Sequence, residues 1–122
     1  MKKIFIEPVY IDLKTIKIDR LKQMLNSMLL SFINAEGIEN VANSVHSFCK
    51  NDDKLPKNVL SLLSSIFYVK SIIEEIDRRM CGDFVKSLKN DKVYKLTKQF
   101  TFEQTKNKTQ FLVWVDEKNI SN

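Results

Sequence analysis

Apolar residues recur through the first two-thirds of the chain with the spacing of amphipathic helices. The clearest run has apolar side chains at positions i, i+3, i+4 and i+7, and it predicts a helix that Asp19 caps and Gly37 ends. The same period restarts after Gly37 and predicts a second helix over residues 38–49. The apolar positions of the first run are Leu21, Met24, Leu25, Met28, Leu29, Phe32 and Ile33.

A third helix is predicted after the polar stretch at residues 50–57, with Asn58 as its N-cap. Its first half is apolar on almost every side, which is typical of a helix that is buried around most of its circumference. Its second half is amphipathic, and Gly82 is predicted to end it. Asp83 is then predicted to cap a short helix over residues 84–88.

Three further stretches have the period-two pattern of β-strands, in which alternate residues share one face. Residues 3–13 alternate in two pieces around Pro8, which predicts a strand that is broken there or lies at a sheet edge. Residues 93–102 and 110–115 also alternate, and the short polar loop at 104–108 between them predicts an antiparallel hairpin. In the first hairpin strand, one face holds Tyr94, Leu96, Phe100 and Phe102, with Lys98 as an anomaly on it.

These elements predict a single α+β domain over residues 1–122. Three or four helices are expected to pack on one face of a small, about three-stranded antiparallel sheet, which the N-terminal strand and the C-terminal hairpin form. The order of the strands is left open. A chain of 122 residues with 43% apolar content can bury a sizeable core, and its two glycines argue against long irregular loops.

The positive charge is concentrated in residues 84–108. This stretch holds seven lysines against Asp91 and Glu103, an excess that equals the formal net charge of +5 of the whole chain. A localised cationic surface favours an anionic partner, either nucleic acid or an acidic protein. However, Lys outnumbers Arg seventeen to three in this chain, and Arg is the better residue for bidentate phosphate contacts.

Aromatic residues are interleaved with these lysines. Proteins bind single-stranded nucleic acid with lysines that follow the phosphates and with aromatic rings that stack on the bases. The alternative interpretation is a solvated sheet surface whose aromatic rings point into the core. The predicted partner-binding residues are Lys86, Lys89, Lys92, Lys95, Lys98, Lys106, Lys108, Tyr94 and Trp114.

Candidate catalytic groups are few. His46 and Cys49 are three residues apart on the predicted second helix, which is the spacing at which an imidazole could activate a thiol, but Cys49 also lies on the apolar stripe of that helix. The charged residues at the end of the third helix are explained by ordinary ion pairs on a helix surface. We expect Glu74 to pair with Arg78 and Glu75 with Arg79, each four residues apart. The sequence has no glycine-rich phosphate loop and no ordinary zinc-ligand spacing, so no catalytic residue, metal or cofactor is predicted.

The N-terminal residues have no signal-peptide pattern, and no apolar run is long enough to span a membrane. We therefore expect a cytoplasmic protein with reduced Cys49 and Cys81 and no membrane partner. The predicted function is that of a small non-enzymatic binding or regulatory protein, which contacts an anionic partner through its lysine-rich C-terminal surface. The alternative is an inhibitor, immunity protein or complex subunit that acts by protein–protein contact. No oligomeric state is predicted.

Overall fold

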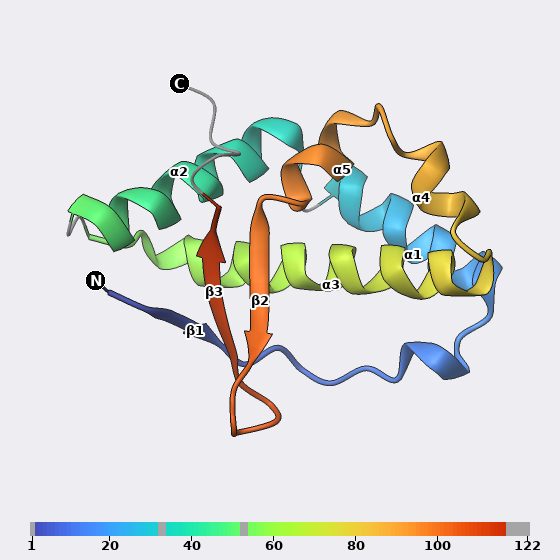
Figure 1. The fold of residues 1–122 in the computed structure, drawn as a ribbon, viewed down its shortest axis with the longest axis horizontal. Helices are drawn as coiled ribbons and strands as arrows, with labels where there is room; N and C mark the ends of the chain where they lie inside the picture. The colour runs from blue at the N-terminus through green and yellow to red at the C-terminus, as the bar shows by residue number, and fades with distance from the viewer. Residues whose placement is uncertain (1, 32–33, 52–53, 117–122) are drawn as a thin grey trace.

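The computed structural model describes residues 2–31, 34–51 and 54–116. Within these residues, five α-helices pack against a three-stranded antiparallel sheet, which confirms the predicted α+β fold (Figure 1). The elements in chain order are β1 (Ile4–Ile6), the 3₁₀ helix η1 (Leu13–Thr15), α1 (Ile18–Ser31), α2 (Ala35–Asn51), α3 (Lys57–Arg79), α4 (Asp83–Ser87), α5 (Lys92–Thr97), β2 (Phe100–Gln104) and β3 (Phe111–Val115).

The sheet has the order β1-β3-β2, so β3 is its central strand. β1 pairs antiparallel with β3, with Ile4 opposite Val113. β2 also pairs antiparallel with β3, with Phe102 opposite Val113. The N-terminal strand therefore lies beside the C-terminal hairpin, as predicted.

The core lies between the sheet and α3, the longest helix, which crosses behind the strands in Figure 1. Leu63, Ile66 and Val69 of α3 have no exposed surface, and they share one apolar cluster with Phe100 of β2. Burial of this surface is the main driving force of folding. The prediction that the first half of α3 is buried on most sides is wrong at its beginning: Val59 and Leu63 are buried, but Leu60 is 45% exposed, so burial there follows one side of the helix. Pro56 rather than Asn58 occupies the N-cap position of α3.

The boundary between α1 and α2 differs from the prediction. Asp19 lies in the first turn of α1 instead of capping it. The side chain of Asn34 accepts a hydrogen bond of 2.8 Å from the backbone N–H of Gly37, so Gly37 belongs to the first turn of α2 and does not end the preceding helix. The predicted apolar positions Phe32 and Ile33 lie outside the described residues.

The predicted N-terminal strand is shorter than its alternating pattern suggests. Pairing with β3 ends before Pro8, because proline has no N–H to donate to a ladder. Val9 and Tyr10 are 76% and 82% exposed, so their alternation does not reflect a buried face. The chain then forms η1, which begins where the side chain of Asp12 accepts a hydrogen bond from the N–H of Lys14 at 3.2 Å.

The prediction of a strand over residues 93–102 is wrong in its first half. This part forms α5, and β2 begins only at Phe100. The side chain of Asp91 accepts a hydrogen bond of 2.9 Å from the N–H of Tyr94, which is the contact that begins a helix at an N-cap. Lys98 follows the last residue of α5, so it does not interrupt an apolar strand face.

Glu75 of α3 is a carboxylate that the fold almost completely covers, with 8% of its surface exposed. It accepts hydrogen bonds from Nη2 of Arg78 at 2.6 Å and from Nε of Arg79 at 2.8 Å. These two bonds hold the pKa of the Glu75 carboxyl at about 2. The predicted pair of Glu75 with Arg79 is confirmed, but among the described residues Arg78 pairs with Glu75 and not with Glu74.

Arg79 also connects α3 to the N-terminal segment. Its Nη1 donates to the carbonyl of Ile16 at 2.5 Å, and its Nη2 donates to the carbonyl of Leu13 at 2.8 Å. The predicted surface pair is therefore part of a network that fixes η1 against the end of α3.

Candidate binding surface

The turn after α3 positions the first part of the lysine-rich stretch. Cys81 and Gly82 have positive φ angles of 54° and 91°, which reverse the chain at the end of α3. Gly82 occupies the N-cap position of α4, while the predicted cap Asp83 is the first residue of that helix. The carboxylate of Asp77 accepts a hydrogen bond of 2.8 Å from the N–H of Val85, so the last turn of α3 holds the first turn of α4.

Five of the predicted lysines lie on α4, α5 and the turns beside them. All five are exposed. Successive lysines are three residues apart, which on a helix displaces each by about 60° from the one before. The three lysines on α5 and its end therefore lie on one side of that helical turn, within about 120°. We call this set the lysine segment: Lys86, Lys89, Lys92, Lys95 and Lys98.

Two members of the lysine segment make contacts with neighbouring side chains. Nζ of Lys92 lies 3.8 Å from a carboxylate oxygen of Glu39 on α2, and Nζ of Lys98 lies 5.5 Å from the centre of the Tyr94 ring. Within the part of the chain that the structure describes, the pair with Glu39 is the one ion pair of the lysine segment. The other four lysines of the segment form no ion pair with a carboxylate of the described residues.

The other two predicted lysines lie elsewhere. Lys106 and Lys108 belong to the loop that joins β2 to β3, and this loop is at the end of the hairpin that points away from α4 and α5 (Figure 1). The structure therefore divides the seven lysines into a group of five and a group of two.

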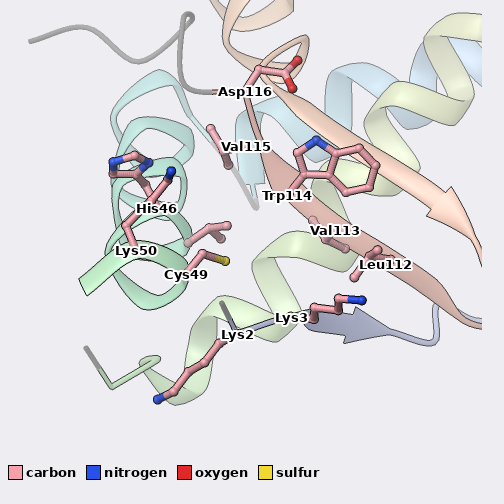
Figure 2. A pocket seen from close by; sticks show the side chains of 11 residues that line it. Lys2, Lys3, His46, Cys49, Lys50, Leu112, Val113, Trp114, Val115 and Asp116 are labelled. Atoms are coloured by element: carbon pink, nitrogen blue, oxygen red, sulfur yellow. The ribbon is translucent and has the colours of Figure 1, made fainter. Parts of the chain in front are cut away.

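The two predicted aromatic residues are not placed together. Tyr94 on α5 is half-buried and packs against the core beneath Lys98. Trp114 is on β3, opposite Thr101 of β2, and it lines a cleft of about 600 Å³ between α2 and the end of β3 (Figure 2). The lysine segment does not line this cleft, so no single row of lysines and exposed rings is formed.

The same cleft contains the candidate nucleophile. Figure 2 shows the sulfur of Cys49 directed into the cleft, while the imidazole of His46, which also lines the cleft, points away from that sulfur. Burial raises the pKa of the Cys49 thiol, and the nearby charge of Lys50 opposes that effect only in part. Cys49 and the exposed Cys81 are both free cysteines. The arrangement presents an unactivated thiol on an apolar wall rather than a nucleophile beside its base.

Lys70 is a contact residue that the sequence analysis did not select. Its Nζ donates a hydrogen bond of 2.7 Å to the carbonyl of Phe100 and lies 5.7 Å from the centre of the Phe102 ring. Burial lowers the pKa of the Lys70 ammonium, and the carboxylate of Glu74 opposes this shift. The available signal was a single lysine within the otherwise uncharged stretch of the third helix.

Comparison with models of known protein families found no match, and comparisons with curated proteins and with solved structures found none either. Among the described residues, no helix is both long enough and apolar enough to cross a membrane. Those residues also contain no cluster of three His, Cys, Asp or Glu side chains that could hold a metal ion. The only indication of function is therefore the surface of the described residues.

Proposed function

We propose that this chain is a small non-enzymatic binding protein that contacts an anionic partner through the lysine segment. The observation that carries the proposal is the placement of five exposed lysines on one short helical region with a single ion pair among the described residues. A cationic surface of this kind binds an anionic polymer favourably, because binding releases the counterions that are condensed on the polymer.

Nucleic acid is the first partner to test. The lysine segment bears no arginine, so it offers point charges to phosphates and no bidentate contacts to base edges. Binding through such contacts is expected to be insensitive to base sequence and to weaken steeply as salt rises.

The direct experiment measures binding of a fluorescent single-stranded 20-mer and of polyglutamate across a salt series. The variant Lys86→Gln/Lys89→Gln/Lys95→Gln/Lys98→Gln should bind the preferred polymer at least about tenfold more weakly. For the single strand, the slope of log affinity against log salt should fall by about 3, since each lost phosphate contact removes about 0.7.

The matched control removes four exposed lysines from other parts of the molecule and changes the net charge equally. These are Lys14, Lys17, Lys54 and Lys57. The control should retain most of the affinity and the slope of the unmodified protein. Equal losses in both variants, or no binding of either polymer at low salt, would refute the proposed function. A preference for polyglutamate would identify the partner as an acidic protein.

A second candidate function is protein–protein contact, as an inhibitor, immunity protein or subunit. The observation that favours it is the position of β2 at the edge of the sheet, since an edge strand can pair with a strand of another protein.

A further inference from the structure

β2 has one side that is paired with β3 and one side that is not. Two backbone hydrogen bonds, from Asp116 N to Gln99 O and from Thr105 N to Gln110 O, both 3.0 Å long, join residues that stand directly opposite each other in this register. Because bonded and non-bonded pairs alternate in an antiparallel ladder, the odd-numbered residues of β2 bond to β3. The N–H and C=O groups of its even-numbered residues therefore point away from the sheet.

These outward groups are only partly used. The carbonyl of Phe100 accepts the hydrogen bond from Lys70. For the backbone N–H and C=O of Phe102 and Gln104, no partner exists within residues 2–31, 34–51 and 54–116. Figure 1 shows no strand or helix alongside β2 on this side, and α3 passes behind the strand. β2 thus offers two donors and two acceptors along a free edge.

One hollow lies between this edge and α3, and a second lies between α3, α4 and α5. The first has a volume of about 260 Å³ and is lined by Phe67, Phe102 and Phe111 together with Lys70, Ser71 and Glu74. The other has a volume of about 210 Å³ and is lined by Tyr94 and Lys98 among others. Lys70 and Glu74 line both hollows, so the two are neighbouring parts of one groove that follows α3 and passes the β2 edge at one end.

The geometry points to a strand-addition site, in which an extended acidic segment of a partner protein pairs with the free edge of β2. This inference rests on the second candidate function and deepens it by naming the chemistry of the partner. Its contacts are the backbone of β2 and the groove along α3 rather than the lysine segment as a whole. Alternate side chains of an added strand project to the same face. An apolar side chain could therefore fill the aromatic hollow, and a carboxylate two residues away could meet Lys70 and Lys98.

The charge of the groove favours an acidic segment of a partner protein over β2 of a second copy of the chain. The groove carries two lysines against Glu74, and the molecule has a formal net charge of +5. Pairing of β2 with β2 of another copy would bring two such cationic grooves together, whereas an acidic segment compensates them. The partly buried ammonium of Lys70, whose hydrogen bond goes to the neutral carbonyl of Phe100, strengthens this preference, because a partly desolvated charge gains from a nearby counterion.

Phage-displayed random dodecapeptides, selected on the full chain, provide the probe. The expected result is a set of peptides that combine an apolar residue with an acidic residue two positions away. Gln104→Pro removes one outward N–H and leaves the bonds to β3, so it should weaken the selected peptides roughly two- to tenfold. Gln104→Ala keeps that N–H and is the matched control, with thermal unfolding used to verify that both variants fold.

Two further measurements complete the test. Lys98→Glu should weaken the same peptides roughly two- to fivefold. Bound peptide should slow hydrogen exchange at the amides of Phe102 and Gln104 in the unmodified protein. The variant Lys86→Gln/Lys89→Gln/Lys92→Gln should bind these peptides normally, which separates this site from the lysine segment.

Several results would overturn the inference. They are the recovery of no peptide, peptides without acidic residues, equal binding to the proline and alanine variants, or unchanged exchange at the two amides. A concentration-dependent dimer that Gln104→Pro dissociates would also overturn it, because the occupant would then be a second copy.

Discussion

At the scale of single residues, the Glu75 carboxylate helps to connect α3 to the η1 region through Arg79. It binds Arg78 and Arg79, and Arg79 in turn holds the carbonyls of the η1 region. Removal of the negative charge would leave the largely covered guanidinium of Arg79 without its carboxylate partner, whereas the side chain of Arg78 is mostly exposed to solvent. The network therefore predicts a pH dependence of folding stability.

The folded-state pKa of Glu75 is depressed from 4.5 to about 2, so its stabilisation is complete above pH 4.5 and is lost as pH falls towards 2. Urea unfolding between pH 7 and pH 2.5 should show this loss in the unmodified protein. Glu75→Gln should be less stable at pH 7 and should lack this part of the pH dependence.

Glu74→Gln is the matched control, since the neighbouring Glu74 is exposed. It should retain the pH profile of the unmodified protein. A Glu75→Gln variant that loses stability over the same pH range, and to the same extent, would contradict the assignment of this dependence to Glu75.

At the scale of elements, α5 shows how a single N-cap residue can determine whether a short segment forms a helix or a strand. The apolar pattern of only six residues is compatible with either a helix or a strand. The hydrogen bond from the N–H of Tyr94 to the side chain of Asp91 therefore contributes strongly to the choice of a helix. Asp91→Ala should destabilise the protein by about 1 kcal/mol, and Asp91→Asn should restore most of the loss because Asn is also a good N-cap. Thermal unfolding of the three proteins checks this. Equal losses in the Ala and Asn variants would show that the capping bond is not the cause.

The same contrast explains which elements could be predicted from the sequence. α1, α2 and α3 each repeat the helical period over several turns, so their existence was evident, while their ends depended on Asn34 and Pro56. Residues 9–13 alternate but have no strand to pair with beyond Pro8. Local pattern alone could not show either the missing partner or the preference of residues 92–97 for a helix.

The candidate surface was predictable only in its composition. The exposure of Lys86 to Lys98 follows from their charge, but their helical placement depends on α5, which was predicted as strand. Lys70 was overlooked because its position beside β2 is set by tertiary packing between α3 and the hairpin. The free edge of β2 was likewise fixed by the strand order, which the sequence left open.

At the scale of the whole molecule, the hairpin separates the two groups of lysines. β2 alone, with five residues, spans roughly 15 Å between α5 and the loop that carries Lys106 and Lys108. This separation exceeds the Debye length of about 8 Å at physiological ionic strength. Screening should therefore prevent Lys106 and Lys108 from contributing at long range to a ligand that is bound at the lysine segment.

Paired double variants test this expectation. Lys89→Gln/Lys95→Gln should weaken binding of the anionic 20-mer or polyglutamate at physiological salt, because both side chains belong to the lysine segment. Lys106→Gln/Lys108→Gln changes the net charge equally but should alter the affinity by less than about twofold at that salt, since screening removes its long-range contribution. At low salt, where the Debye length grows to about 30 Å at 0.01 M, the two double variants should become more alike. An equal loss at physiological salt would mean that the contact surface runs from α5 to the hairpin loop and that the division into two groups is wrong.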